Sequence, residues 1–451
     1  MDINLLHNKK VSVIGAVRSG VAVAKLLQSH GAKTFVSDSA EAEKLQSSLR
    51  DLRSEKIEYE VGRHSDRVYE CALMVISPGV PSHAPVVLEA LKRKIKVVSE
   101  LEAGSWFCRA PIVAITGSNG KTTTTTLTGR ILSDAAKKHV VAGNIGTAFS
   151  SVVLELAETD AAVLEVSSFQ LDFIDTFRPK ISVLLNITPD HMDRYDRSME
   201  KYAASKARVF KNQRDDDVLL YNIDDAWTNK IVLNAFCRTI GFSVRQKLAE
   251  GAFVEDGNLV TSIGGTRTEI IEIGRIFIKG VHNLYNSMAA VLVGQLLGVG
   301  ASHIQSTLKT FEGVEHRLEF VRRINDVNYY NDSKATNVDS VWFALQSFKE
   351  PIVLFLGGRD KGNDYSRLTD LVRKQVKAIV AIGESANLVE QSFKGVAVIK
   401  KASSMEEAVD LGRFLAQPGD VVLLSPACAS FDWFKNYEHR GEVFKQLVNK
   451  L

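Results

Sequence analysis

The sequence has few cysteines, no long apolar run and almost no net charge. Its four cysteines, Cys71, Cys108, Cys237 and Cys428, lie far apart and form no CxxC pair, which argues against a zinc ribbon or a disulfide framework. No stretch approaches the ~20 apolar residues of a membrane span, and the N-terminus has no apolar leader core. The net charge of +3 is spread without basic runs, so nothing indicates a nucleic-acid surface. We therefore expect a soluble cytoplasmic protein with no nucleic-acid partner and no membrane insertion.

The composition is that of an ordinary globular protein with room for two or three domains. Hydrophobic residues make up 45% of the chain and charged residues 24%. Short apolar runs alternate with amphipathic segments in three successive blocks, which predicts an α/β fold built on parallel sheets. We expect three domains: a Rossmann-like N-terminal domain (residues 1–106), a central P-loop-type mononucleotide-binding ATPase domain (107–313) and a C-terminal Rossmann-like α/β domain (314–451).

A glycine-rich loop, AITGSNGKTT, follows an apolar strand-like run in the central block. Because Gly117 and Gly120 lack a Cβ, the loop can turn its backbone N–H groups inward toward a phosphate. Lys121 adds a positive charge, and the hydroxyl of Thr122 can bind Mg²⁺. Ile115 stands where a standard P-loop has its first glycine, so the match is to the shorter T-G-x-N-G-K-[ST] form. A strand-to-helix turn with a solvated lysine is the alternative.

The first block imitates a dinucleotide-binding fold. A strand ends at Ile14, the turn Gly15–Gly20 opens a helix, and a second strand ends at Asp38. Val17 replaces the middle glycine of the dinucleotide fingerprint, so its side chain hinders close approach of a pyrophosphate and disfavours a plain NAD site. Asp38 can still accept hydrogen bonds from a ribose or a base. A Rossmann-like fold without a ligand stays open as the other interpretation.

Three polar side chains of the central block occupy unusual positions. Glu165 ends an apolar run, where burial of its carboxylate is costly unless the group is paired or bound to a cation. His191 follows another apolar run and a turn, and Lys206 lies in a helix-like segment. Taken singly, a structural histidine and a surface lysine are the plainer interpretations.

Polar clusters follow three apolar runs of the third block. They are Asp332–Lys334, Asp360–Lys361 and Ser425–Ser430. Ligands of open parallel sheets bind at the carboxyl ends of the strands, so we expect these clusters to converge on one site. The aromatic residues that follow Ser430 suggest packing, with Tyr437 as the exception that could contact a ligand.

Taken together, the motifs give the whole chain a resemblance to the Mur ligase family. They are TGSNGKTT, GNIG, LEVSSFQL, NITPDHMDRY, HNLYN, HRLE, NDSKATN and SPACASFDWFKNYEHRG. The phosphate loop and HNLYN are shared with folylpolyglutamate synthases, whereas NDSKATN and SPACASFDWFKNYEHRG resemble the D-glutamate-adding branch. Relatives that add meso-diaminopimelate or lysine carry a DYAHTP-type segment in place of NDSKATN.

The resemblance implies an ATP-dependent amide ligase of peptidoglycan precursor synthesis. Its expected partners are ATP, UDP-N-acetylmuramoyl-L-alanine and D-glutamate, and the reaction proceeds through an acyl phosphate with release of ADP and phosphate. It implies two Mg²⁺ ions and a carbamylated Lys206, whose carbamate supplies an anionic oxygen ligand in place of an ammonium. We expect a monomer. Two rivals remain: a folylpolyglutamate synthase-like ligase, which would lack the first block, and a catalytically silent nucleotide-binding relative.

By matching motif positions, the resemblance also implies site residues. The catalytic set is Lys121, Glu165, His191 and Lys206. The metal ligands are Thr122, Glu165, His191 and Lys206 as its carbamate. The ATP-binding set is Gly117, Ser118, Asn119, Gly120, Lys121, Thr122, Thr123, Asn283, Arg317, Asp332 and Lys334. The UDP-muramoyl-alanine set is Arg18, Ser19, Asp38, Ser39, Gly79, Asn144 and His191. The D-glutamate set is Thr336, Lys361, Ser430, Phe431 and Tyr437.

Overall fold

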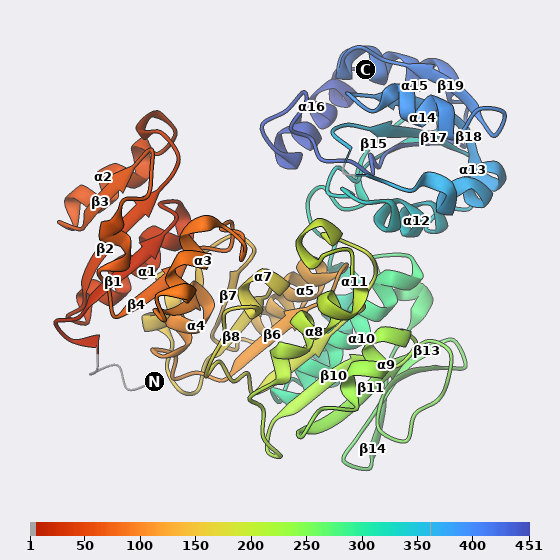
Figure 1. Cartoon of the computed structure of the whole chain (residues 1–451). Coiled ribbons are helices and arrows are strands. Elements are labelled where there is room, and N and C mark those ends of the chain that lie inside the picture. The colour runs from red at the N-terminus through yellow and green to blue at the C-terminus, as the bar shows by residue number, and fades with distance from the viewer. Residues whose placement is uncertain (1–5, 361) are drawn as a thin grey trace. The chain divides into compact units, whose positions relative to one another are not determined.

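The computed structural model describes residues 6–360 and 362–451, and within them the chain forms three β-sheets flanked by helices (Figure 1). The α/β fold expected from the sequence is confirmed. The chain divides into two compact units: Met1–Ile273 with Tyr285–Thr307, and Gly274–Leu284 with Leu308–Leu451. The first two sheets lie in the first unit and the third sheet in the second. The domain limits after residues 106 and 313 stay predictions.

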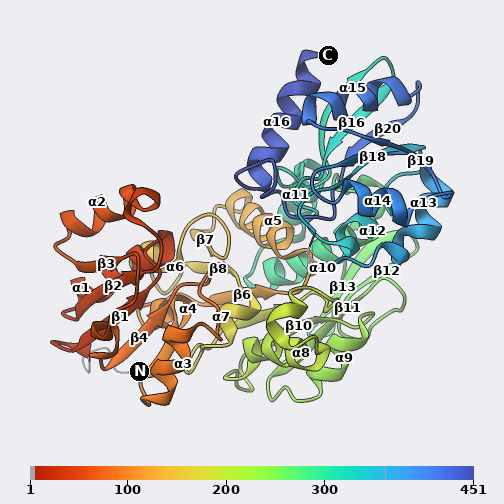
Figure 2. The same ribbon diagram turned by 45° about the horizontal axis from the view of Figure 1, so that its top comes forward.

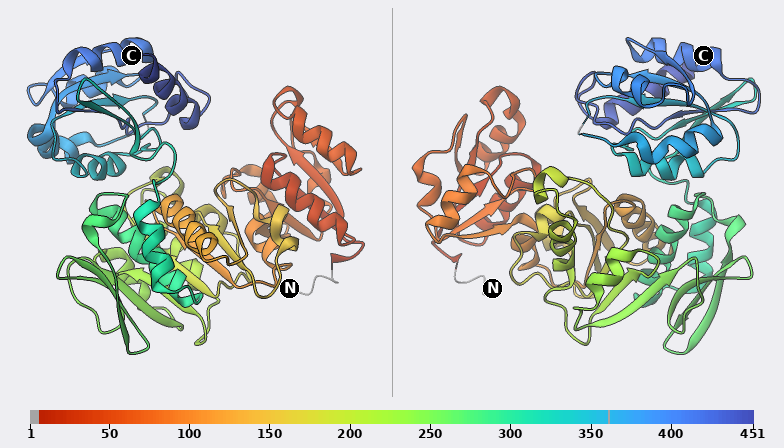
Figure 3. Two further views of the ribbon diagram at one scale, coloured as in Figure 1. Left: turned by 180° about the vertical axis from the view of Figure 1, so that it is seen from behind. Right: turned by 45° about the vertical axis from the view of Figure 1, so that its right-hand side comes forward.

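The first sheet is parallel and has helices on both faces (Figure 3). In spatial order its strands are β3 (Glu58–Val61), β2 (Lys33–Asp38), β1 (Lys10–Ile14), β4 (Leu73–Ile76) and β5 (Lys96–Ser99). Its helices are α1 (Arg18–Ser29), α2 (Gln46–Ser54), α3 (Pro85–Lys92) and α4 (Glu100–Ser105), with short 3₁₀ helices η2 (Ala42–Lys44) and η3 (Asp66–Tyr69). Alternate strand residues face opposite sides: Val11 and Val13 share a core with α1 and α2, whereas Met74 and Ile76 pack with α3.

The central sheet is parallel up to a terminal antiparallel extension, which is green in Figures 1 and 3. In spatial order its strands are β14 (Thr266–Glu272), β13 (Asn258–Ile263), β12 (Gly251–Glu255), β11 (Arg238–Ser243), β10 (Val218–Asn222), β9 (Ile181–Leu184), β6 (Ile112–Thr116), β8 (Ala161–Glu165) and β7 (His139–Gly143). The run Ile112–Thr116 is buried at every position, as expected for a strand covered on both faces.

Helices connect and cover the central strands. They are α5 (Lys121–Asp134), α6 (Phe149–Val152), α7 (Ser168–Leu171), α8 (Met199–Ala207), α9 (Ala226–Val232), α10 (Val281–Leu296) and α11 (Ala301–Thr310), with 3₁₀ helices η4 (Val153–Glu155), η5 (Met192–Tyr195), η6 (Arg208–Phe210) and η7 (Ile273–Arg275). A Cβ at Gly294 would lie 2.9 Å from Ile131 Cγ2, so glycine lets α10 pack closely against α5. Among the described residues, no helix has both the length and the apolar character needed to cross a bilayer.

A buried carboxylate joins the first sheet to the central one within the first unit. Glu102 of α4 is fully buried, and its carboxylate accepts hydrogen bonds from the backbone N–H groups of Asp175, Thr176 and Phe177 at 2.7–3.0 Å. The indole N–H of Trp106 donates to the same carboxylate at 2.8 Å. These bonds satisfy a charge that would otherwise be costly to bury, and they fix α4 to the segment that precedes β9.

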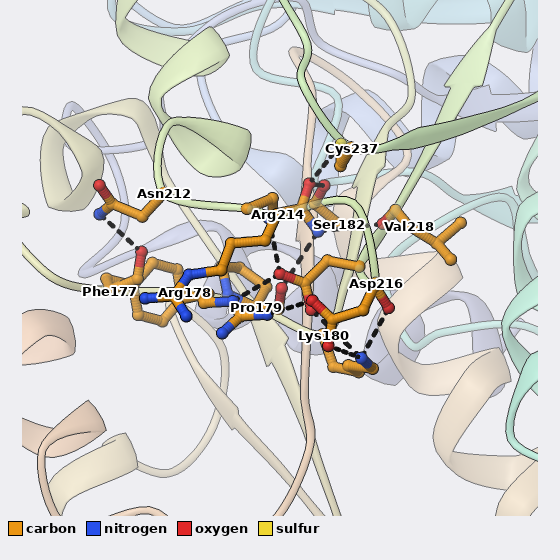
Figure 4. Close-up of polar contacts among 12 residues, drawn as sticks. Phe177, Arg178, Pro179, Lys180, Ser182, Asn212, Arg214, Asp216, Val218 and Cys237 are labelled. Carbon is orange, nitrogen blue, oxygen red and sulfur yellow. Dashed lines mark hydrogen bonds and ion pairs between the residues drawn. The ribbon is translucent and has the colours of Figure 1, made fainter.

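An ion cluster stabilises the amino end of the central strands β9 and β10 (Figure 4). The carboxylate of Asp217 is buried and lies 2.5 Å from Arg178 Nε and 3.4 Å from Lys180 Nζ. Both cations also pair with the exposed Asp216. Asp217 further accepts the backbone N–H of Arg214 at 2.9 Å. Every charge in the cluster has a partner, so we assign it a structural role.

The third sheet has helical layers on both faces (Figure 2). In spatial order its strands are β15 (Glu319–Ile324), β16 (Val327–Asn331), β20 (Val421–Leu424), β17 (Ile352–Gly357), β18 (Val376–Ile382) and β19 (Val398–Lys401). Its helices are α12 (Val338–Gln346), α13 (Thr369–Gln375), α14 (Ala386–Ser392), α15 (Met405–Leu415) and α16 (Tyr437–Lys450), with the 3₁₀ helix η8 (Tyr365–Leu368). Helices α12, α13 and α14 share one core with the sheet, and α15 and α16 share the other.

Side-chain caps set where three of these helices begin. Asn337, Ser404 and Asn436 each accept a hydrogen bond from the backbone N–H three residues ahead, at the starts of α12, α15 and α16. The strands β16, β20 and β17 are adjacent and parallel. The described residues of the polar clusters predicted to follow these strands therefore lie at one edge of the third sheet.

Candidate active site

The phosphate loop connects β6 to α5, and its backbone conformation requires glycine at two positions. Gly117 has φ +157° and Gly120 has φ +85°. A Cβ at Gly120 would lie 2.2 Å from Asn286 Oδ1, and one at Gly117 would lie 2.9 Å from Leu185 Cβ. Both glycines are therefore needed for the turn and for the close approach of its neighbours. The first turn of α5 begins directly after the loop, where helix N–H groups favour an anion.

Lys121, Ser118 and Asn119 hold the phosphate loop in place. Lys121 Nζ donates to the carbonyl oxygens of Gly117 and Ser118 at 2.9 and 2.8 Å. The hydroxyl of Ser118 donates to the carbonyl of Thr188 at 2.8 Å, and the N–H of Asn119 donates to Asn186 Oδ1 at 2.9 Å. The loop is thus held against the segment that follows β9.

Thr122, Thr123 and Asn286 complete the surroundings of this loop. Thr122 and Thr123 are buried in the first turn of α5. Asn286 of α10 is also buried, and its Oδ1 accepts a hydrogen bond from the hydroxyl of Thr124 at 3.3 Å. Sequence reasoning selected Asn283 from HNLYN and missed Asn286. The second asparagine of that motif, one helical turn further on, was the available signal.

Glu165 ends β8, directly beside β6, with its carboxylate buried. Its Oε1 accepts a hydrogen bond from Asn144 Nδ2 at 3.0 Å, whereas Oε2 has no hydrogen-bond partner among the residues that the structure describes. An unpartnered buried carboxylate oxygen is costly. Oxygen ligands of this kind suit Mg²⁺, so the donor set of Glu165 and the Thr122 hydroxyl fits that ion.

Lys206 of α8 contacts the phosphate loop. It is 1% exposed, its Nζ donates to the carbonyl of Gly117 at 2.8 Å, and its Nζ lies 4.6 Å from the centre of the Tyr202 ring. Burial lowers the pKa of Lys206 well below its ordinary value, and repulsion from Lys121 adds to this effect, against the attraction of Asp190 and other carboxylates. The sequence-based alternative of a surface lysine is wrong.

His191 lies on an irregular turn before η5. Its backbone is left-handed, with φ +54°. Its ring makes an edge contact with Phe169 at 4.9 Å, and Nε2 lies 3.6 Å from the Asp190 carboxylate. The side chain is 40% exposed, so it is accessible to a ligand.

In the second unit, Asp332 follows β16 and is buried. Its Oδ2 accepts the hydroxyl of Ser425 at 2.7 Å, and its Oδ1 accepts the backbone N–H of Leu318 at 3.3 Å. Burial raises the pKa of Asp332 to about 7, against the lowering effects of Ser425 and Arg317.

Arg317 Nε is buried without a hydrogen-bond partner among the described residues. Asn283, near the start of α10, donates its side-chain N–H to the carbonyl of Lys279.

The described residues of the set predicted for D-glutamate lie around the same sheet edge. Lys334 Nζ lies 5.3 Å from the centre of the Tyr437 ring. Ser430 is buried after β20, Phe431 is 59% exposed, and Thr336 is half-buried. Lys361 lies outside the described residues. Its neighbour Asp360 caps its own turn by accepting the N–H groups of Gly362 and Asn363.

Sequence reasoning missed Arg440, which joins two segments of this edge. The guanidinium is 1% exposed and donates to Ser333 Oγ, to the Ser333 carbonyl and to the Cys428 carbonyl, at 2.9, 2.7 and 3.1 Å. The hydroxyl of Ser333 in turn donates to the carbonyl of Tyr437 at 2.8 Å. Burial lowers the pKa of Arg440 to about 10. Arginine in the motif NYEHRG was the only signal, and it did not reveal burial.

A cavity of about 630 Å³ lies at the carboxyl edge of the first sheet. Six of the seven residues predicted for UDP-muramoyl-alanine line it: Arg18, Ser19, Asp38, Ser39, Gly79 and Asn144. His191 is not among the described residues that line it. The carboxylate of Asp38 accepts hydrogen bonds from the N–H groups of Ala16 and Ala40 at 2.7 and 2.8 Å. These bonds hold the turns that follow β1 and β2. Sequence reasoning missed His64, which also lines the cavity.

Three sheets, with a phosphate loop on the middle one, define a multidomain α/β nucleotide-binding protein. Three family models match it: the Mur ligase MurD-like N-terminal domain at residues 9–99, the Mur ligase middle domain at 115–294, and the Mur ligase glutamate ligase domain at 316–428. The chain belongs to the Mur ligase family.

Curated relatives agree with this assignment, and a solved structure shares the fold. The chain is 47% identical to the UDP-N-acetylmuramoylalanine--D-glutamate ligase of Salinibacter ruber, over 99% of each protein. It is 44% identical to the enzyme of that name from Chloroherpeton thalassium, again over 99% of each. A pseudomurein peptide ligase type C from Methanothermus fervidus has a similar fold, with a TM-score of 0.63 at 18% identity over 98% of this chain and 100% of that one.

Proposed function

We propose that this Mur ligase adds D-glutamate to UDP-N-acetylmuramoyl-L-alanine, at the expense of ATP, in peptidoglycan precursor synthesis. The observation that carries the proposal is the 47% identity, over 99% of both chains, to a relative named for that reaction. In the first step a carboxylate oxygen of the muramoyl substrate attacks the γ-phosphorus and ADP leaves. In the second step the D-glutamate amine attacks the carbonyl carbon of the acyl phosphate, phosphate leaves, and the amine loses a proton.

Mur ligases use ATP with Mg²⁺, and this chain offers oxygen donors for the ion. Thr122 and Glu165 would hold it, because the buried Glu165 Oε2 has no hydrogen-bond partner among the described residues. The ion supplies charge neutralisation between triphosphate and carboxylate. Gly117, Gly120 and the first turn of α5 supply N–H groups for the phosphates, and Lys121 supplies a cation.

A second ion and a modified lysine are the finer part of the proposal. His191 and Lys206 would hold that second ion, with Lys206 carbamylated. A buried ammonium beside Lys121 is unfavourable, since burial and repulsion both oppose the charged form. A carbamate replaces that cation by an anion with oxygen donors, which is the donor type that Mg²⁺ takes.

The remaining proposed contacts lie at the cavity of the first sheet and in the second unit. The cavity at the first sheet would take the uridine nucleotide, since six of the residues predicted for it line one space. In the second unit, Asn283 would contact the adenine of ATP, Arg317 its phosphates and Asp332 its ribose. Lys334 would complete the ATP-binding set. Thr336, Lys361, Ser430, Phe431 and Tyr437 would surround D-glutamate. The match of residues 9–99 to the MurD-like N-terminal domain disfavours the folylpolyglutamate synthase-like rival.

A phosphate-release assay tests this function. The chain is incubated with ATP, Mg²⁺, UDP-N-acetylmuramoyl-L-alanine and one amino acid at a time. We expect turnover with D-glutamate and little with L-glutamate, L-lysine or meso-diaminopimelate. Equal rates across the panel contradict the D-glutamate assignment, and no phosphate release with any amino acid favours the catalytically silent alternative.

A further inference from the structure

Three hydrogen-bonded side chains, Glu60, Ser37 and His64, connect strands β3 and β2 to the lining of the cavity at the first sheet. Ser37 of β2 and Glu60 of β3 are paired in register and are joined by a hydrogen bond of 2.8 Å from Ser37 Oγ to Glu60 Oε1. The same Ser37 Oγ lies 2.7 Å from Nδ1 of His64, whose ring lines the cavity. Ser37 is fully buried, so no bulk water competes for these bonds.

The position of the serine proton follows from the state of Glu60. Burial raises the pKa of Glu60, but hydrogen bonds from Ser65 and Ser37 outweigh burial and hold the pKa below its ordinary value. Glu60 is therefore an ionised carboxylate near neutral pH, and a carboxylate only accepts hydrogen bonds. The single hydroxyl proton of Ser37 must then point to Glu60 Oε1.

The proton position on His64 follows in turn. Since Ser37 has given its only proton to Glu60, Ser37 Oγ can contact His64 Nδ1 at 2.7 Å only by accepting an Nδ1–H. Burial lowers the pKa of His64 below its ordinary value, against the opposing effects of Asp38 and Glu60, so the ring is neutral near pH 7. A neutral ring with Nδ1–H carries a lone pair on Nε2. No described residue hydrogen-bonds that nitrogen.

We propose that His64 selects the base of the nucleotide bound in this cavity, by accepting the N3–H of uracil at Nε2. The inference rests on the proposed function, which places the uridine nucleotide here. Uracil presents a hydrogen-bond donor at N3, whereas cytosine presents a lone pair at the same position. His64 Nε2, as a fixed acceptor, therefore forms a hydrogen bond with uracil N3–H. With cytosine the two lone pairs repel each other. Glu60 and Ser37 act as positioning residues, because they fix the tautomer of the ring.

Titration of the full-length chain with UDP and CDP, followed by calorimetry, tests this selection. We expect UDP to bind at least about tenfold more tightly than CDP. His64→Ala lowers the affinity for UDP about tenfold and leaves that for CDP within about twofold, so the preference is lost. Ser37→Ala frees the tautomer and shifts the ratio in the same direction. The matched control is His303→Ala on α11, an exposed histidine outside the cavity, which keeps the wild-type ratio.

A spectroscopic measurement tests these hydrogen bonds without a variant that could misfold. Long-range ¹H–¹⁵N spectra of the wild-type chain should show Nε2 of His64 as an unprotonated nitrogen and Nδ1 as protonated. A protonated Nε2 overturns the proposal, and so does an unchanged ratio of UDP to CDP affinity in folded His64→Ala.

Failure of the ligase proposal is distinguishable from failure of this inference. Turnover of D-glutamate by the wild-type chain, with an unchanged nucleotide ratio in His64→Ala, overturns base selection alone. No turnover with any amino acid, with a UDP preference that His64→Ala abolishes, overturns the ligase assignment and supports base selection. Binding of neither nucleotide, together with no turnover, overturns both.

Discussion

At the scale of single residues, Lys206 shows most clearly how surroundings decide chemistry. A lysine in a helix-like segment is ordinarily a solvated cation. Here the side chain is buried against the carbonyl of Gly117, near a second lysine. The sequence could place Lys206 on a helix, but it could not show that the helix turns this position toward the phosphate loop. That contact joins residues 89 positions apart.

The first residue-scale prediction concerns the carbamate. We expect Lys206→Ala and Lys206→Arg each to lower kcat at least about 100-fold while the fold survives, because arginine keeps the charge but cannot supply an oxygen ligand. Lys201→Arg, an exposed lysine of the same helix, is the control and should keep wild-type activity. Activity is measured at saturating substrates and Mg²⁺.

A second readout for Lys206 does not depend on turnover. Carbon-13 NMR of the wild-type chain in labelled bicarbonate should show a carbamate carbon that is absent from Lys206→Arg. Near wild-type turnover in Lys206→Arg would contradict the carbamate and return this residue to a simple ion-pair role.

The second residue-scale prediction concerns Arg440. Its guanidinium ties Ser333, next to the predicted ligand residue Lys334, to Cys428, two positions before Ser430. Lysine cannot make all three bonds, so Arg440→Lys should raise the KM for D-glutamate about tenfold or more. The KM for UDP-N-acetylmuramoyl-L-alanine should change less than twofold. Arg373→Lys, at an exposed ion pair, is the control. Equal increases in both KM values would indicate general destabilisation instead of positioning.

At the scale of elements, the sequence predicts best where local pattern and burial agree. Apolar runs ending near Ile14, Ile115 and Glu165 correspond to β1, β6 and β8. The sequence did not predict the pairing of Asp217 with Arg178 and Lys180, because the charges come from segments about 40 residues apart that meet only when β9 and β10 align.

The element-scale prediction concerns the ion cluster of Asp217, Arg178 and Lys180. Asp217→Asn should destabilise the chain by about 1–2 kcal/mol, because the charge-assisted contacts of Arg178 and Lys180 with the buried carboxylate are lost while both partly exposed cations keep Asp216. Equilibrium urea unfolding measures the change, followed by fluorescence and circular dichroism. Asp215→Asn, at an exposed neighbouring position, is the control and should stay within about 0.5 kcal/mol of wild type. A wild-type unfolding curve for Asp217→Asn would show that the cluster adds nothing.

At the scale of the whole molecule, the three α/β blocks could be predicted, but the grouping into compact units could not. Alternating apolar and amphipathic segments mark where each block begins. The sequence does not reveal that Glu102 of α4 accepts hydrogen bonds from residues more than 70 positions later. The first unit therefore contains the predicted domain 1–106 and most of the predicted domain 107–313. The cavity at the first sheet could not be predicted for the same reason, since Gly143 and Asn144 line it together with residues of the first sheet.

The last prediction follows from these contacts between the first sheet and the central sheet. A fragment of residues 1–106 should be much less stable than a fragment of residues 1–313, because it leaves the buried Glu100 and Glu102 without Ser150 and Thr176. It also lacks part of the cavity wall, so its affinity for UDP should fall about tenfold or more relative to the longer fragment. Thermal unfolding and calorimetry measure both effects. Cooperative unfolding of residues 1–106 at the temperature of the longer fragment, with undiminished UDP binding, would show that the first domain folds and binds independently of the central sheet.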